Sequence, residues 1–309
     1  MPTPSIVFIA GPPKCGTTWL MRTIDAHADA VLTDEWHLAS RLLYPVLSEV
    51  EKFAMESPKL RLANDREHKA EPLNRDDAVA TLRFLHDRMF AKALDLAERR
   101  GQDRARVRLL GDKSPGHTRH IEMLSQLYPE AKFIVCVRDV RDAAVSAYMH
   151  FVRKGVLPDF FRPANGLAES AEVFARHHWA EMLRFARGAG ARLGPERYLE
   201  VGYAEHTRAP HTTISRVFEF LGTPVSESEV NELVERNSFQ ALSGGREAGQ
   251  EQNERVRKGV VGDWRNHFTS DFGDFLERIA AERLAMGEAI MDNTPRVTWR
   301  GNATAKQAG

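Results

Sequence analysis

The sequence has few of the features that mark disulfide-rich, membrane-spanning or nucleic-acid-binding proteins. Its only two cysteines, Cys15 and Cys136, are too few for a disulfide framework and lack metal-site spacing, which favours a reducing compartment, the cytoplasm. No apolar run approaches the roughly 20 residues of a membrane span, and the run SIVFIA lacks the flanks of a signal peptide. Lys and Arg number 43, as do Asp and Glu. This balance argues against a nucleic-acid or anionic-membrane partner, because both need a broad basic surface.

The composition is that of a globular protein with a large core. Of the 309 residues, 42% are hydrophobic and 28% are charged, which is enough for one elaborated domain. No internal repeat or low-complexity stretch divides the chain. We therefore expect a single domain over residues 1–294, followed by a disordered tail over residues 295–309.

Short apolar runs alternate with stretches that carry hydrophobic residues at helical spacing. The runs have the character of buried parallel strands, and they occupy residues 5–11, 106–111, 133–137 and 197–203. Helices are predicted over residues 17–27, 117–129, 141–152, 212–222, 226–236 and 270–291. The alternation predicts a three-layer α/β/α fold, in which helices cover both faces of a central parallel sheet.

Residues 36–100 break this alternation, because they are strongly charged, helical in pattern and without a strand signal. We interpret them as an inserted helical cap on the side where the acceptor would bind. Its aromatic residues are expected to shape that pocket. They are Trp36, Tyr44, Phe53, Phe84 and Phe90.

The stretch FIAGPPKCGTTW, residues 8–19, begins like the phosphate loop of nucleoside-triphosphate enzymes and then departs from it. Gly11 and Gly16 have the spacing of G-x-x-x-x-G-K-[ST], a loop that points backbone N–H groups at a phosphate. Thr17 stands where that loop has its lysine, and Lys14 lies inside the loop instead. From there its ammonium can face the bond between a bound phosphate and its leaving partner. The loop therefore predicts an anionic ligand without the usual lysine and magnesium arrangement.

Two further stretches predict phosphate contacts. In VRDVRDAAVSAY, Arg138 ends a predicted strand and Ser146 lies two turns into the following helix, so both can converge on one phosphate. In RVRKGVVGDWRNHF, Arg257 and Lys258 precede Gly259 in a cationic turn whose backbone can approach a phosphate closely. Each motif alone is weak, since surface arginines and basic loops are common.

Taken together, these motifs resemble the sulfotransferases that use 3′-phosphoadenosine 5′-phosphosulfate (PAPS). PPKCGTTW is similar to the family's 5′-phosphosulfate loop, P-K-S-G-T-T-W, with Cys15 in place of serine. The resemblance implies that Lys14 contacts the bridging oxygen of the phosphosulfate and that Trp19 stacks near the adenine. The loop residues that it implies for donor binding are Pro13, Lys14, Cys15, Gly16, Thr17 and Thr18.

The resemblance extends to the residues that contact the 3′-phosphate and the adenine ring. Arg138 and Ser146 match the two ligand positions of the family's 3′-phosphate motif, and RKGVVGDWRNHF matches R-K-G-x-x-G-D-W-[KR]-x-x-F. These matches imply that Arg257, Lys258 and Gly259 close over the 3′-phosphate. Tyr203 is implied as the adenine-side tyrosine and Phe239 as a ring packed on the base. The implied donor is PAPS and the product is 3′-phosphoadenosine 5′-phosphate (PAP), with no metal required.

Three residues are candidates for the base that takes the acceptor's proton, in the order Asp112, Glu35 and His117. GDKSPGH resembles the D/E-K-[ST]-P segment of carbohydrate-type sulfotransferases, which implies Asp112 as the base and Lys113 as a sulfuryl contact. TTWLMRTIDAHADAVLTDEW is similar to the start of tyrosylprotein sulfotransferases, whose catalytic glutamate falls on Glu35. Cytosolic-type enzymes use a histidine near this point, and His117 is two residues from its usual place. Lys14 is expected to stabilise the leaving phosphate during in-line transfer.

Other activities remain open at this stage. A P-loop small-molecule kinase that uses ATP and Mg²⁺ would need a lysine beside Gly16, which has Thr17 instead. A non-catalytic nucleotide-binding scaffold would bind the same ligand without turnover. For the sulfotransferase we expect a small-molecule acceptor that offers a hydroxyl or amine. The family's dimer pattern is partly matched between Arg265 and Asp274, which predicts a homodimer.

Overall fold

The computed structural model describes residues 4–56, 73–155, 165–250 and 257–286, together with positions 59 and 70. Its centre is a five-stranded sheet in the order β2-β3-β1-β4-β5, in which every neighbouring pair is parallel. The strands are β1 (Ser5–Ala10), β2 (Ala30–Asp34), β3 (Leu109–Lys113), β4 (Lys132–Val137) and β5 (Tyr198–Gly202). This is the parallel sheet that the alternating pattern predicts.

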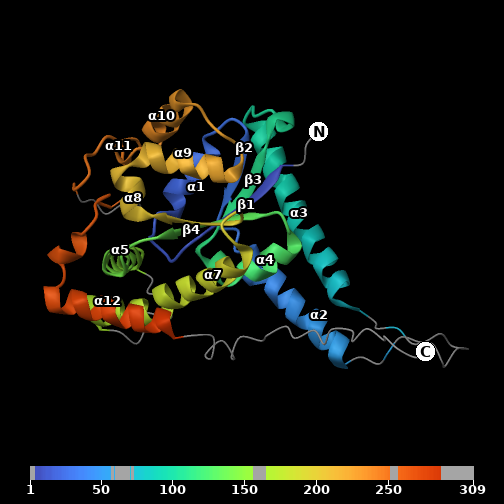
Figure 1. Ribbon diagram of the computed structural model, residues 1–309, viewed down its shortest axis with the longest axis horizontal. Coiled ribbons are helices and arrows are strands. Elements are labelled where there is room, and N and C mark those ends of the chain that lie inside the picture. Colours follow the sequence, from blue (N-terminus) through green and yellow to red (C-terminus); the bar gives the residue numbers. More distant parts are fainter. Residues whose placement is uncertain are drawn as a thin grey trace, which may run out of the picture.

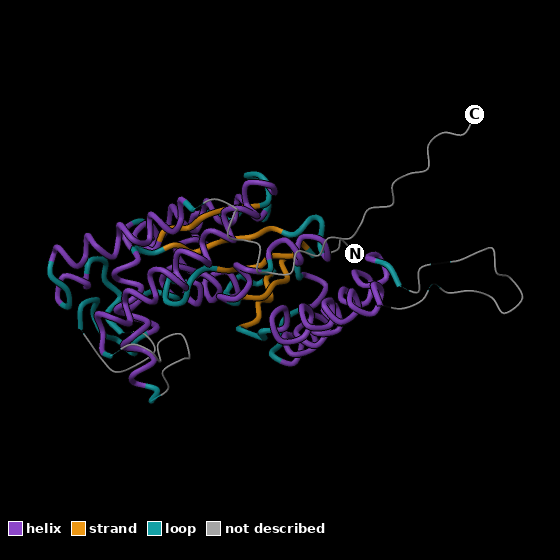
Figure 2. The backbone as a smooth tube through the Cα atoms, turned by 90° about the horizontal axis from the view of Figure 1, so that it is seen from below, coloured by secondary structure: helices purple, strands orange, loops and turns teal. Residues whose placement is uncertain are grey.

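Helices cover both faces of the sheet, so the three-layer prediction is confirmed (Figure 1). One face carries α1 (Thr17–Asp25), α9 (Pro210–Leu221) and α10 (Glu227–Arg236). The other carries α4 (Ile121–Leu127) and α7 (Ala180–Leu193), and α12 (Ser270–Ala285) packs outside α7. Seen from below, the strands lie between these helical layers (Figure 2). The apolar side chains of the middle strand from Val7 to Ala10 have no exposed surface.

The remaining helices connect or flank these layers. They are α2 (Tyr44–Glu56), α3 (Arg75–Arg99), α5 (Val140–Arg153), α6 (Gly166–Phe174), α8 (Tyr203–Arg208) and α11 (Phe239–Leu242). Short 3₁₀ turns span Arg104–Arg106, Pro115–Arg119 and Asp263–Asn266, and π turns span Ala39–Leu43 and Ala175–Trp179. Ser226 and Glu229 form the capping box of α10, in which the Ser226 hydroxyl accepts from the Glu229 N–H.

Several elements differ from the sequence prediction. β2 was not predicted, because its run AVLTD is short and sits against an expected helical region. The predicted helix over 117–129 begins only at Ile121, since Pro115 starts a 3₁₀ turn with a different hydrogen-bond period. α12 is described only to Ala285, and the predicted tail over 295–309 lies outside the described residues.

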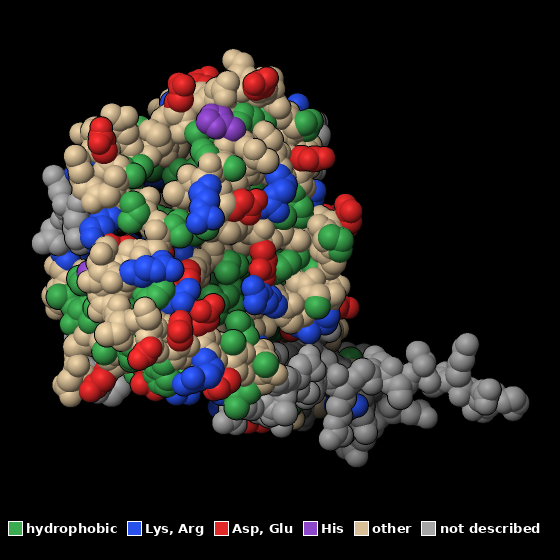
Figure 3. Space-filling model, turned by 60° about the vertical axis from the view of Figure 1, so that its left-hand side comes forward, with side chains coloured by type: hydrophobic (Ala, Val, Ile, Leu, Met, Phe, Trp, Pro, Cys, Tyr) green, Lys and Arg blue, Asp and Glu red, His purple; other side chains and the backbone are tan. Residues whose placement is uncertain are grey.

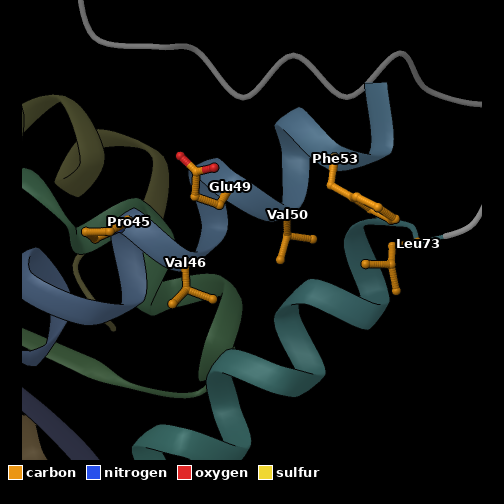
Figure 4. Close-up of a pocket in the computed structure, with 6 residues that line it drawn as sticks. All are labelled: Pro45, Val46, Glu49, Val50, Phe53 and Leu73. Carbon is orange, nitrogen blue, oxygen red and sulfur yellow. The ribbon is translucent and has the colours of Figure 1, made fainter. Parts of the chain in front are cut away.

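Most described residues of segment 36–100 are helical, in the π turn Ala39–Leu43 and in α2 and α3. Asn74 caps α3 by a capping box with Asp77. A shallow groove of about 370 Å³ lies between α2 and the start of α3 (Figure 4). Its walls are apolar except at one position: Pro45, Val46, Glu49, Val50, Phe53 and Leu73. In the described part of the chain, no helix has the length and hydrophobicity that a membrane span requires.

Candidate active site

The carboxyl ends of all five strands meet at one cleft of about 920 Å³. The chain leaves β1 toward β2 and leaves β4 toward β5, so the crossovers diverge between the adjacent strands β1 and β4. Parallel sheets bind ligands at this kind of switch point, because the diverging connections leave a crevice there. The cleft is lined by the loop after β1, by Glu35 after β2, by Pro115 after β3, by Arg138 after β4 and by Tyr203 after β5.

The glycine loop after β1 is held tightly against the sheet. A Cβ on Gly11 would lie 2.4 Å from the carbonyl oxygen of Cys136, so only glycine fits there. Gly16 is the N-cap of α1 with φ of 97°, and a Cβ there would lie 2.6 Å from Cε1 of His206. The N-terminus of α1 therefore points into the cleft, with Thr17 and Thr18 among the lining residues. Unpaired N–H groups and the helix dipole make this end a site for an anion.

The backbone is strained at three points, and all three line the cleft. Among the described residues, the non-glycine residues with positive φ are Lys14 at 70°, Glu35 at 50° and His37 at 53°. Left-handed conformations are unfavourable for side chains with a Cβ, and they persist where the surrounding structure enforces them. The strain thus concentrates where the predicted leaving-group lysine and a predicted base meet the same cavity.

Aromatic rings form a wall beside the loop. Trp19 stacks on His206 with ring centroids 4.3 Å apart and an interplanar angle of 14°. Its indole N–H donates to the carbonyl oxygen of Asn237 at 2.9 Å. His206 also meets the edge of Tyr203, with centroids 4.7 Å apart. One face of the indole is thus covered, and a planar ligand has only the opposite face to stack on.

The side chain of Arg138 packs against Tyr203, one of these aromatic rings. Its guanidinium sits 3.9 Å from the centroid of Tyr203 and donates to the carbonyl oxygens of Lys14 and Val260, each at 3.2 Å. Within the described residues its buried Nε has no hydrogen-bond partner. Ser146, two turns along α5, lines the same cleft and is 8% exposed. An arginine that is stacked, fixed and still has an open donor is suited to a phosphate oxygen.

The segment after residue 256 closes the cleft from the opposite side. Asp142 at the start of α5 accepts from the backbone N–H groups of Gly262 and Trp264, at 2.7 and 3.0 Å. These two bonds hold the turn that carries Gly259. Gly259 has φ of 68°, and a Cβ there would lie 2.2 Å from the ring of Phe239.

The two cations of this segment share one carboxylate. Asp263 accepts from Lys258 Nζ at 2.9 Å and from the guanidinium of Arg257. Although its burial opposes ionisation, these bonds hold the pKa of Asp263 far below its usual range. Both cations line the cleft. The residues that the family resemblance implies for the 3′-phosphate therefore border one cavity.

Glu35 is the predicted base that reaches the cleft. Its Oε1 accepts from Lys113 Nζ at 2.6 Å, and its Oε2 lies 3.8 Å from His37 Nε2. Lys113 has no exposed side-chain surface, and it also lies 2.5 Å from Asp34 Oδ1. Lys113 does not line the cleft, so the implied sulfuryl contact has no support in this geometry. The buried lysine instead fixes one oxygen of Glu35.

Asp112 and His117 form a buried pair away from the cleft. Their side chains are 1–2% exposed, and His117 Nε2 lies 2.7 Å from Asp112 Oδ2. Asp112 Oδ1 accepts from Thr33 Oγ1 at 2.7 Å. Neither residue lines the cavity. The structure therefore separates both from the Glu35 position.

Other residues that the sequence analysis singled out also do not line the cleft. Cys15 is fully buried and absent from the cleft wall, and burial raises the pKa of its thiol to about 12. The predicted aromatic residues of segment 36–100 also lie off the cleft, and among the described residues of that segment only His37 lines it. Several lining residues were not predicted: Arg22, His37, His150, Phe151, Arg153, Lys154 and His206. Among them, His150 and Arg153 follow Ser146 at helical spacing on α5, and this spacing could have predicted that they share its face.

The charge of this side of the molecule is mixed. On the face that carries α5, α8, α11 and α12, basic side chains stand among acidic and apolar ones (Figure 3). Among the described residues, no group of three or more His, Cys, Asp or Glu side chains converges as a metal site would. The basic residues that line the cleft include Lys14, Arg138, Arg257 and Lys258.

In sequence, the chain is similar to curated sulfotransferases. The chain is 26% identical over 193 residues to 3-alpha-hydroxysteroid sulfotransferase from Cavia porcellus, covering 57% of this chain and 65% of that protein. It is 23% identical over 292 residues to protein-tyrosine sulfotransferase 2 from Gallus gallus, covering 94% and 71%. Several curated relatives are thus matched over less than two thirds of their own length.

The fold agrees with that of solved sulfotransferases. Mouse sulfotransferase SULT7A1, solved in complex with PAP, superimposes with a TM-score of 0.55 at 19% identity, over 92% of this chain and 85% of that one. The model of the family described as "Sulfotransferase family" matches residues 4–227, which hold the glycine loop, Arg138 and Tyr203. The chain therefore belongs to the sulfotransferase family.

Proposed function

We propose that this protein is a PAPS-dependent sulfotransferase that transfers a sulfuryl group to a hydroxyl or amine of a small-molecule acceptor. One observation carries the proposal. A single cleft joins a glycine loop with an internal lysine, Lys14, to the second cationic cluster around Arg138 and Arg257. PAPS carries anionic groups at two separate positions of its ribose, the 3′-phosphate and the 5′-phosphosulfate, so it matches two separated clusters. The kinase alternative has no support, because Thr17 replaces its lysine and the chain belongs to another family.

The shape and hydrogen-bonding groups of the cleft fit the donor. The N-terminus of α1 suits the 5′-phosphate, and the open face of Trp19 suits the adenine, with Phe239 as the facing ring. Arg138 has a buried donor without a partner in the described residues, which a 3′-phosphate oxygen would satisfy. Ser146 and the turn at Gly259 lie beside it on the same cleft. When bound, PAPS supplies the activated sulfuryl group.

Lys14 and the helix N-terminus act on the leaving phosphate. Negative charge develops on the oxygen that links phosphate to sulfur as this bond breaks. Lys14 lies in the strained loop and lines the cleft, so its positive charge can offset the charge on that oxygen. The N–H groups at the start of α1 add fixed dipoles that require no reorganisation.

Glu35 accepts the proton of the acceptor. Lys113 holds its Oε1, so Oε2 is the oxygen that faces the reaction, with His37 beside it. Asp112 is unsuited to this role because it is buried and already bonded to His117 and Thr33. We assign Lys113 as a positioning residue, since it is buried and acts on Glu35 alone among the cleft residues described here.

The acceptor occupies the part of the cleft that the donor leaves free. The lining residues there are His37, Pro115, His150, Phe151, Arg153 and Lys154. Relatives differ in the acceptors that their names state, a hydroxysteroid in one and protein tyrosine in another. We propose a small molecule, because the whole cleft measures about 920 Å³ and the donor takes a large share of it.

Thermal-shift titration separates the candidate functions. Stabilisation by PAP without metal supports the sulfotransferase, and stabilisation only by ATP with Mg²⁺ would support a kinase. A screen of hydroxyl and amine acceptors with labelled PAPS then tests turnover. PAP binding without transfer to any acceptor would favour a non-catalytic scaffold.

Compartment and assembly are further proposals. Both cysteines are free and buried, which agrees with a reducing cytoplasm. We propose a homodimer through the segment from Arg265 to Asp274, whose helix begins at Ser270. Sedimentation of the wild-type protein and of Asp274→Arg tests it: a dimer that the substitution does not disrupt would place the interface elsewhere.

A further inference from the structure

The end of α5 brings basic side chains into the cleft that belong to none of the motifs that predict donor contacts. His150 and Arg153 follow Ser146 by one and two helical turns on the same face of α5, and Lys154 caps the end of the helix. All three line the cleft. Lys154 is exposed and the other two are half-buried, so a ligand in the cleft can reach them.

His150 and Arg153 form a pair that offers hydrogen-bond donors. Nη2 of Arg153 donates to Nδ1 of His150 at 2.9 Å. Because arginine has no acceptor atom, Nδ1 must supply the lone pair, and the neutral ring then carries its hydrogen on Nε2. Any hydrogen bond that this pair makes to a ligand is therefore one in which the ligand accepts.

The charge of the lining residues points to the same kind of ligand. Among the lining residues that the structure describes, seven are Lys or Arg, and Glu35 is the single carboxylate. The donor assignments above use four of these cations: Lys14, Arg138, Arg257 and Lys258. Arg153 and Lys154 add positive charge beyond them, at the far end of α5. A ligand with a negative group there is complementary to this charge, and a neutral or cationic one is not.

We propose that the acceptor carries an oxyanion, a carboxylate or a phosphate monoester, which binds to Arg153 and His150 beside Lys154. The proposal rests on the proposed sulfotransferase function and names its acceptor class, a small hydroxylated or aminated acid. The planar guanidinium suits either oxyanion. The anionic group does not react. Its binding holds the acceptor in the cleft so that the hydroxyl or amine at its other end is positioned for Glu35.

Matched acceptor pairs test the proposal with labelled PAPS. One pair is 4-hydroxyphenylacetate and its methyl ester, and the other is glycerol 3-phosphate and glycerol. We expect kcat/KM for the charged member to be at least about 10-fold higher in one pair or both, as for a hydrogen bond to a charged group. The pair that shows the preference identifies the oxyanion as carboxylate or phosphate.

Two results in the wild type would overturn the proposal. The first is a kcat/KM for the neutral member that equals or exceeds that of the charged member in both pairs. The second is no turnover of any of the four compounds, combined with no calorimetric binding of the charged members to the protein with PAP.

Arg153→Gln tests the residue that the proposal names. It should lower kcat/KM for the preferred charged acceptor about 10- to 100-fold. It should leave kcat/KM for the neutral member and PAP affinity within a factor of about three. His150→Phe removes the nitrogen that holds the guanidinium and should lose part of the preference, and full preference would remove His150 from the site. Arg176→Gln, at an arginine outside the cleft that pairs with Glu172, is the matched control and should keep it.

PAP affinity separates an acceptor role of Arg153 from a donor role. An unchanged preference in Arg153→Gln would contradict the proposal, and a loss of PAP affinity with the preference intact would place Arg153 among the donor contacts instead. Failure of wild type to bind PAP would refute the PAPS-binding function. The oxyanion site would survive that result if 4-hydroxyphenylacetate or glycerol 3-phosphate still bound to wild type and not to Arg153→Gln.

Discussion

At the donor end of the cleft, binding residues hold one another in place: Arg138 stacks on Tyr203, and His206 stacks on Trp19. At the acceptor end, Glu35 is held from behind by Lys113, and the other lining residues come from the last turn of α5 and from single positions after strands. The donor end is a network fixed by backbone turns and stacked rings. The proposed acceptor end is one anchored carboxylate, and its cleft neighbours are not stacked on one another in this way.

The largest expected effect is at the anchored carboxylate. Glu35→Gln should lower kcat about 10²- to 10⁴-fold, because the isosteric amide cannot accept the proton. PAP affinity should stay within a factor of about three, since the residue faces the acceptor. Single-turnover rates with labelled PAPS measure the first effect, and calorimetry measures the second.

Asp112→Asn is the matched control for Glu35→Gln. It changes a carboxylate on the adjacent strand that is buried with His117. We expect a lower melting temperature with a much smaller loss of kcat. If Asp112→Asn loses the larger share of kcat at full stability, the base is Asp112 and the assignment of Glu35 is wrong.

At the donor end, Lys14→Ala should lower kcat about 10²- to 10³-fold through lost stabilisation of the leaving phosphate. Arg22→Ala, at another cation of the same cleft, is the comparison variant. Both are measured as single-turnover rates at saturating donor. A Lys14→Ala rate within a factor of two of wild type would remove this lysine from the chemistry.

Arg138→Lys tests whether the network, rather than charge alone, binds the donor. Lysine keeps the charge but loses the planar stack on Tyr203 and the two bonds to backbone carbonyls. We expect PAP affinity to fall about 10- to 100-fold, as for one or two charged hydrogen bonds. Arg187→Lys, at a residue paired with Glu200 outside the cleft, should bind PAP normally. Equal affinity of Arg138→Lys and wild type would show that a positive charge suffices.

The smallest effect concerns pH and stability. Burial lowers the pKa of His86 to about 4 and that of His206 to about 3. Between those values and about 6.5, the unfolded chain binds protons that the folded chain excludes, so stability falls as pH decreases. Calorimetric scans from pH 7 to 5 should show a falling melting temperature. His206→Phe should have a shallower slope than wild type, and an identical slope would contradict a neutral buried ring.

The donor end was largely predictable from sequence, because its groups depend on chain geometry. Gly11 and Gly16 are dictated by close contacts and positive φ, and such constraints leave a spacing that can be read. The acceptor end was less predictable. β2 was missed, and the sequence alone could not decide between Asp112 and Glu35 as the base, because a single carboxylate at a strand end does not reveal which face it occupies. His206 carried no motif, since its role arises from stacking between segments far apart in the chain.

A single helix, α5, contributes residues to both the proposed donor end and the proposed acceptor end of the cleft. The first turn of α5 carries Asp142, which fastens the turn over the donor, and its last turn carries His150 and Arg153 on the acceptor side. At about 1.5 Å per residue, its 14 residues span about 21 Å. Laboratory evolution of new acceptor preferences can therefore randomise the last turn alone, leaving donor use intact. Libraries that shift the whole helix would instead trade one substrate against the other.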